Sequence, residues 1–223
     1  MKNNKMHPHV DVLKADMEEG QISRREFIRK SVLLGMSVSA AYGLAGLSMS
    51  STAVAGTPKR GGNLRVSMRV QEVTDPAKFD SNEKGNVVRH MVEPLTLTDF
   101  DGVTRPHLLE EWEASEDLKT WTLYIRRKVK WSNGDDFTAD DVVFNFNRWL
   151  DPATGSSMQS SLIALTEEVE TGEKNADGSP KKARIPSKGA VEKVNDYTVR
   201  LHLNTPSLSL PESLSEYNAL IVH

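Results

Sequence analysis

The chain carries few side chains whose type and spacing would suit catalysis or metal binding. None of its six histidines is paired with another histidine at i+4 or with a glutamate at metal-ligand spacing. The sequence also lacks a Gly-x-Ser-x-Gly elbow, a P-loop and a Gly-x-Gly-x-x-Gly loop. Since it has no cysteine, disulfides and thiolate metal sites are excluded. These observations favour a protein that is not an enzyme and that holds no cofactor.

Two carboxylate pairs, Asp135-Asp136 and Asp140-Asp141, are the best candidates for general acid–base chemistry. The first pair adjoins a predicted turn at Asn133-Gly134. The second pair falls in the first turn of a predicted helix, where acidic residues interact favourably with the helix dipole. A structural role is therefore favoured for both pairs.

The tryptophans offer another possibility, a platform on which sugars stack. Periodicity places Trp121 on the buried face of a strand and Trp149 on the buried stripe of a helix, so packing accounts for these two. Trp131 precedes the predicted turn and fits either role.

An export signal is the clearest functional pattern in the sequence. Arg24-Arg25 is followed two residues later by Phe27, and residues 31–58 contain no charged side chain. This order is typical of a twin-arginine leader. Ala53 and Ala55 form an A-x-A cleavage site, so we expect a cleaved leader over 1–55 and a mature chain from residue 56.

An uncleaved membrane anchor is the competing interpretation of the same segment. The apolar stretch 32–47 has 16 residues and contains three glycines and two serines. A spanning helix needs about 20 mostly apolar residues, so a cleaved leader is favoured. A lipid anchor would need a cysteine, which the chain lacks.

The composition of residues 56–223 is that of an ordinary globular domain. These 168 residues carry 21 basic and 26 acidic side chains, a net charge near −5. The basic residues are scattered through an acidic chain, so no nucleic-acid partner is expected. A chain of this length can bury one core.

Hydrophobic periodicity predicts a mixed α/β fold for this part. An amphipathic helix is predicted to start at Thr138, with Asp141 completing a capping box, and to end at Asp151-Pro152. Residues 166–190 are charged and rich in turn residues, which indicates an exposed loop. The other expected elements are strands at 64–70, 111–115, 120–129 and 197–203, a hairpin at 96–105, a helix at 84–93 and an amphipathic stretch at 212–217.

The apolar run 219–222 is typical of the beginning of a buried strand, and no turn or cap follows it. We therefore expect the sequence to be a fragment that ends in the middle of a domain.

Short blocks spread over residues 59–223 match the pattern of a known family. The most telling is the turn Trp131-Ser132-Asn133-Gly134 followed by the helix start Phe137-Thr138-Ala139-Asp140-Asp141-Val142. On these blocks the chain resembles the family 5 extracellular solute-binding proteins, the peptide, nickel and opine type that deliver ligands to ABC importers. The other matching blocks are 60–66, 75–76, 92–95, 105–112, 121–123 and 194–200.

The resemblance implies a periplasmic-binding-protein-like fold with two lobes, a hinge, and a ligand enclosed between the lobes. Members are about twice this length or more, so only the first lobe and its extra subdomain are expected here. The implied partners are a ligand, an ABC importer permease in the inner membrane and the twin-arginine export machinery. The implied location is the periplasm, and a monomer is expected.

The resemblance also indicates two ligand-contacting segments. In the oligopeptide-binding members, the loop before the Asp-Pro runs along the ligand, and here it contains Glu72, Val73 and Thr74. A second contact segment follows the capped helix and here contains Ser157 and Met158, where peptide binders tend to have a tyrosine. Ordinary loops are the alternative interpretation of both segments.

Peptides are the expected ligand class, because most of the family's breadth lies there. Oligosaccharides, opines and chelated nickel are alternatives within the same family. An exported enzyme whose catalytic residues lie in a missing C-terminal half is the alternative from another class.

Overall fold

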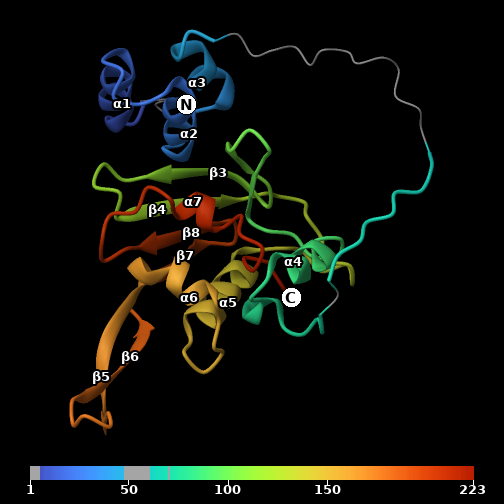
Figure 1. Ribbon diagram of the computed structural model, residues 1–223, viewed down its shortest axis with the longest axis vertical. Coiled ribbons are helices and arrows are strands. Elements are labelled where there is room, and N and C mark those ends of the chain that lie inside the picture. The colour runs from blue at the N-terminus through green and yellow to red at the C-terminus, as the bar shows by residue number, and fades with distance from the viewer. Residues whose placement is uncertain (1–5, 48–60, 70) are drawn as a thin grey trace.

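The computed structural model describes residues 6–47, 61–69 and 71–223. At its centre is an antiparallel four-stranded sheet in the order β3-β4-β8-β7 (Figure 1). The mixed α/β class predicted from the sequence is confirmed. The sheet strands are β3 (Leu109–Ala114), β4 (Thr120–Ile125), β7 (Val191–Asn195) and β8 (Thr198–His202).

The main core lies between this sheet and helix α5 (Ala139–Leu150). Alternation in β4 buries Trp121, Leu123 and Ile125, as the sequence predicts. From the other side, Phe146 and Trp149 of α5 meet edge to face, with ring centroids 5.3 Å apart. Each of these five side chains is at most 1% exposed, so they make up the centre of the core.

The start of α5 follows the predicted capping box. The Thr138 backbone N–H donates to Asp141 Oδ2 at 2.8 Å, and the Asp140 N–H donates to Thr138 Oγ1 at 3.3 Å. These bonds satisfy backbone donors that a helix start otherwise leaves unpaired. Near the middle of the helix, buried Asn145 donates to Val222 O and accepts from the Val222 N–H, which fastens the last residues to α5.

A smaller unit lies beside the sheet. The predicted hairpin is present as β1 (Thr96–Thr98) and β2 (Thr104–Pro106), which pair antiparallel. Helix α4 (Asn82–Val88) is shorter than the predicted helix 84–93. Leu220 forms a bridge with Pro94, so the final apolar run adds backbone pairing there, as expected of the beginning of a strand. The remaining short helices are η1 (Pro76–Lys78), α6 (Met158–Ser161), η2 (Ile163–Leu165) and α7 (Leu210–Ser213).

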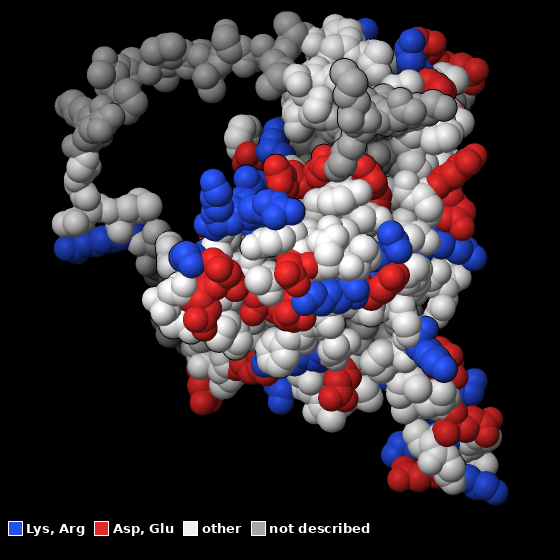
Figure 2. All heavy atoms as spheres, turned by 180° about the vertical axis from the view of Figure 1, so that it is seen from behind, with Lys and Arg blue, Asp and Glu red and all other residues white. Residues whose placement is uncertain are grey.

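The prediction of a loop at 166–190 is wrong. This segment forms an antiparallel hairpin of β5 (Thr166–Lys174) and β6 (Pro180–Pro186), which projects from the body (Figure 1). Charged side chains of both signs lie side by side on it (Figure 2), as in the 2.7 Å ion pairs Arg184–Glu168 and Lys181–Glu173. Because the hairpin is exposed over most of its length, its sequence shows no apolar alternation.

The strand predicted at 64–70 is not formed over the described residues 61–69. Leu64 is 91% exposed and Val66 is 65% exposed. Alternation tells which face of a strand would be buried, but a strand also needs a partner to bind its backbone groups. In the described part of the chain, no segment pairs with these residues.

The N-terminal segment, which the sequence predicts to be an export leader, forms three helices in its described residues 6–47. They are α1 (His9–Glu18), α2 (Arg24–Leu33) and α3 (Val38–Leu44). They pack together and lie beside the edge strand β3 (Figure 1). Within the described ranges, no helix combines the length and the apolar character needed to span a membrane.

Candidate ligand-binding site

The second predicted ligand-contacting segment is hydrogen-bonded to Ala77 and Phe79, which follow shortly after the first predicted segment. Ser156 Oγ donates to Ala77 O at 2.7 Å, and the Ser157 N–H donates to the same oxygen at 3.2 Å. Ser157 Oγ donates to Phe79 O at 2.7 Å. Helix η1, which follows the first segment directly, is therefore held against the start of α6.

Asp75 fixes the end of the first segment. Its carboxylate accepts the Ala77 N–H at 3.0 Å, which caps η1. The same carboxylate forms an ion pair with Arg148 of α5. The loop is thus anchored both to its own continuation and to the helix at the centre of the fold.

A third element joins this junction. Asn218, which is buried, donates to Ser157 Oγ at 2.6 Å. Ser157 therefore connects the second segment both to the residues after η1 and to the C-terminal segment. Its hydroxyl is held by these two hydrogen bonds, which favours a positioning role for this side chain.

The predicted contact residues differ in what they present to solvent. Glu72, Val73 and Thr74 are exposed, with Val73 at 43%. Ser157 is half-buried, whereas Met158 is 0% exposed and belongs to the main core. In this structure the side chains of the first segment face solvent, whereas the side chain of Met158, which the sequence places among the ligand contacts, is packed in the main core.

The backbone of the first segment is also available. Among the described residues, the backbone N–H and C=O groups of Glu72, Val73 and Thr74 form no hydrogen bond with protein. Backbone donors and acceptors that are unpaired can bind an extended chain. Residue spacing in the sequence does not reveal that these backbone groups are unpaired, because pairing depends on the position of the loop in the fold.

The other candidates for chemistry have structural roles. Asp136 forms an ion pair with Lys130 at 2.7 Å, and Asp141 belongs to the capping box of α5. Trp131 is half-buried and meets the rings of Phe137 and His223 edge to face. In the described part of the chain, no three His, Asp or Glu side chains are grouped as metal ligands.

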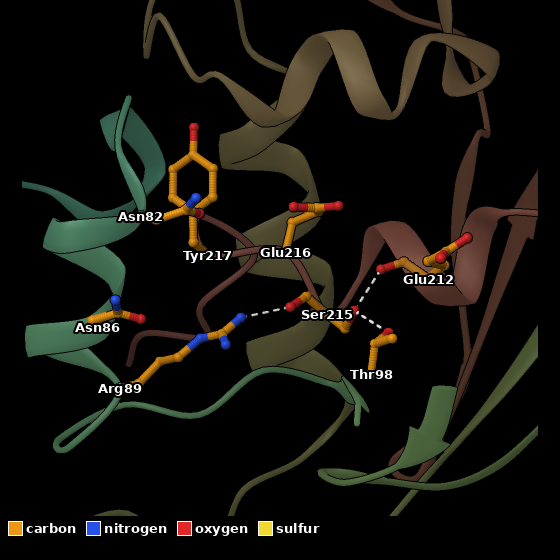
Figure 3. Close-up of a pocket in the computed structure, with 8 residues that line it drawn as sticks. All are labelled: Asn82, Asn86, Arg89, Thr98, Glu212, Ser215, Glu216 and Tyr217. Carbon is orange, nitrogen blue, oxygen red and sulfur yellow. Dashed lines mark hydrogen bonds between the residues drawn. The ribbon is translucent and has the colours of Figure 1, made fainter. Parts of the chain in front are cut away.

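A polar cavity of about 240 Å³ lies between α4, β1 and the residues after α7 (Figure 3). Arg89 Nη2 donates to Ser215 O at 2.6 Å, and Thr98 Oγ1 and Ser215 Oγ are 2.7 Å apart. Ser215 Oγ also donates to Glu212 O at 2.7 Å. These hydrogen bonds connect β1 and the residue after α4 to the residues after α7. No pattern in the sequence marks this cavity, because its walls come from three separate parts of the chain.

Comparison with known families identifies the protein class. The family described as bacterial extracellular solute-binding proteins, family 5 (middle part), matches residues 103–223, which is more than half of the chain. The chain belongs to this family, as the short blocks in its sequence indicate. Members named in the comparisons are binding proteins and not enzymes.

Individual relatives support the same assignment. The periplasmic oligopeptide-binding protein OppA of Haemophilus influenzae is 39% identical over 132 residues, which cover 59% of this chain and 23% of that protein. The oligopeptide-binding protein OppA of Bacillus subtilis is 31% identical over 150 residues, covering 66% of this chain and 26% of that protein. The chain therefore spans about a quarter of the length of these relatives.

Solved structures confirm the fold. The Haemophilus influenzae OppA complex with the peptide RPPGFSPFR superposes with a TM-score of 0.54 at 34% identity, over 68% of this chain and 28% of that one. The unliganded open form of the murein tripeptide-binding protein MppA gives a TM-score of 0.54 at 26% identity, over 67% and 28%. The chain thus has part of a periplasmic-binding-protein fold, as predicted.

Proposed function

We propose that the chain is part of the exported binding protein of an ABC importer, which captures short peptides in the periplasm and delivers them to a permease in the inner membrane. Family membership supports the binding role, and the names of the most similar relatives support peptides. The observation that carries the proposal in this chain is the exposed, unpaired backbone of residues 72–74 beside the anchored Asp75.

The chemistry of residues 72–74 suits a peptide. A peptide in an extended conformation supplies backbone donors and acceptors at regular spacing, which can pair with the free groups of this segment. The exposed carboxylate of Glu72 offers a partner for a basic side chain or an amino terminus. A sugar or an opine would use these groups less completely, because neither carries a repeating amide backbone.

Other ligand classes occur among proteins with this fold. Solved structures at 22–24% identity include AgaA with agropinic acid and NikZ of Campylobacter jejuni with Ni(L-His). At that identity the likeness concerns the fold alone. Opines, chelated nickel and oligosaccharides are therefore the alternatives that the experiment must include.

Ligand-dependent thermal stability of the full-length protein tests the proposal. A binding protein closes over its ligand and is stabilised by RT ln(1 + [L]/Kd), about 2.7 kcal/mol at a hundredfold excess over Kd. We expect short peptides to raise the melting temperature most in a panel of peptides, oligosaccharides, opines and nickel chelates. The peptide should be recovered chemically unchanged.

A pair of substitutions at one position tests the backbone contact. Val73→Pro removes the backbone N–H, whereas Val73→Ala keeps it and shortens the side chain. Because Val73 is exposed, both variants should melt close to the parent without ligand. We expect the peptide-induced shift to be lost in Val73→Pro and kept in Val73→Ala. An equal shift in both variants would place the ligand elsewhere, and conversion of a solute to product would refute the binding role.

A further inference from the structure

The three N-terminal helices share a hydrophobic core with the folded body. This second core is separate from the one beneath the sheet. From the body it includes buried Val103, with Leu118 and Leu208 packed against it. The buried N-terminal members are Val10, Phe27, Ile28, Val32, Leu34, Ala41 and Ala45.

Polar contacts hold the same interface. Arg29 Nη2 donates to both carboxylate oxygens of Glu212, at 2.6 and 2.7 Å. The indole N–H of buried Trp112 donates to Leu33 O at 3.0 Å. His7 and His9 lie within 3.1 Å of backbone oxygens that follow β3. The interface thus combines apolar burial with contacts that require a specific orientation.

Packing is incomplete at one end of the interface. A cavity of about 360 Å³ lies between α2 and the residues that lead into α7. Arg29 and Leu33 line it from α2, and Pro206, Leu208 and Glu212 line it from the body. This cavity is open to solvent, so α2 and the body do not pack closely along it.

The docked position buries Phe27 of the export signal and engages Arg25, while the side chains of both arginines stay exposed. Phe27 is 0% exposed and Ile28 is 3% exposed, both within the shared core. Arg25 donates to Asp101 O through Nε and Nη2, at 3.3 and 3.1 Å. Arg24 is exposed and forms no hydrogen bond or ion pair with the part of the body that the structure describes. A receptor that reads the arginine pair together with Phe27 cannot reach Phe27 in this state.

We infer that this interface is a latch, in which residues 6–47 dock on the folded body and withhold the export signal until they separate from it. The inference rests on the proposed export of the protein and on the twin-arginine route that its sequence predicts. In a two-state equilibrium, the affinity of the receptor for the precursor is reduced by the fraction of molecules that are undocked. Weakening the docking contact should therefore increase capture by the export machinery.

The absence of cysteine from the chain allows a direct test with a single introduced thiol. Val103→Cys in the uncleaved precursor places the thiol at a body position that is 2% exposed and packs against the N-terminal helices. Its rate of maleimide labelling reports separation of the latch. Glu212→Arg places a second positive charge opposite Arg29. Combining it with Arg29→Glu restores a pair of opposite charges. Lys14→Glu alters a pair within α1 and serves as the control.

We expect Glu212→Arg to raise the labelling rate about tenfold, the double charge swap to return it close to the parent value, and Lys14→Glu to leave it unchanged. Capture of the Glu212→Arg precursor by the receptor should rise in parallel. Equal labelling in the parent and in Glu212→Arg would overturn the inference. Faster labelling with unchanged capture would overturn it as well, because docking would then not control the signal.

Failure of the export proposal itself has a different signature. If the precursor leaves the cytoplasm without using Arg24-Arg25, the substitution of both arginines by lysine leaves export unchanged. Labelling of Val103→Cys would then still measure docking, but capture by the twin-arginine receptor would be absent in every variant.

Discussion

At the scale of single residues, periodicity predicts burial correctly wherever a regular element presents one face to the core. Trp121 and Trp149 are both 0% exposed, as their spacing indicates. Trp112 was placed in a short strand, but its bond to Leu33 in the N-terminal segment was not predicted. That contact joins residues 79 positions apart, and a local pattern contains no information about such a partner.

Trp149 allows a quantitative test of core packing. We expect Trp149→Ala to lower the free energy of unfolding by about 3–5 kcal/mol, because it leaves a cavity among fully buried side chains. Trp149→Phe should cost less than half as much, since the indole N–H has no hydrogen-bond partner in the described structure. Phe144→Ala, at a position 49% exposed on the same helix, is the matched control and should change stability little. Denaturant unfolding measures all three, and an unchanged midpoint for Trp149→Ala would contradict the assignment.

At the scale of elements, the sequence predicts helix α5 well, because its capping box, its buried stripe and its end at Asp151 are all local sequence signals. The β5–β6 hairpin was missed because ladder hydrogen bonds and cross-strand ion pairs stabilise it, with little apolar burial. The predicted strand at 64–70 shows the opposite case, in which the pattern is present and a partner strand is not. Strand formation depends on pairing between distant segments. A sequence pattern shows which residues suit a strand, but it does not show which other segment will pair with them.

The turn of the β1–β2 hairpin gives a prediction about pH. Hydrogen bonds from Arg105 hold the pKa of Asp101 below its ordinary value of 3.8. A carboxylate with a lowered folded pKa contributes stability that is complete above the unfolded value, and this contribution is lost as the pH falls through the folded value. Asp101→Asn lacks this contribution at every pH.

We therefore expect the melting temperature of Asp101→Asn to fall less than that of the parent as the pH is lowered from about 5 to about 2. The difference between the two proteins should be largest above pH 3.8 and should shrink below it. Glu110→Gln, at an exposed position on β3, is the control and should follow the parent curve. Parallel curves for Asp101→Asn and the parent would show that the Arg105 contact does not contribute to folding.

At the scale of the whole molecule, the family and the general fold followed from short sequence blocks, whereas the arrangement of the N-terminal helices did not. Ser156 and Ser157 of the second predicted ligand segment are hydrogen-bonded to Ala77 and Phe79, which follow the first predicted segment. Contact of either segment with a ligand stays a prediction. The cleavage residues Ala53 and Ala55, and the predicted boundary between residues 55 and 56, lie outside the described residues.

Export concerns the whole precursor, and the sequence predicts that it depends on the arginine pair Arg24-Arg25. Arg24→Lys combined with Arg25→Lys should abolish delivery to the periplasm, because lysine keeps the charge but not the planar guanidinium that the receptor reads. Neither substitution alters a buried side chain, so the precursor should fold as before. Arg69→Lys, at an exposed position outside the N-terminal segment, is the matched control and should be exported normally. Cell fractionation followed by detection of the processed chain provides the measurement. Full delivery of the double variant would show that the protein is exported by the general secretory route, and the twin-arginine assignment would have to be abandoned.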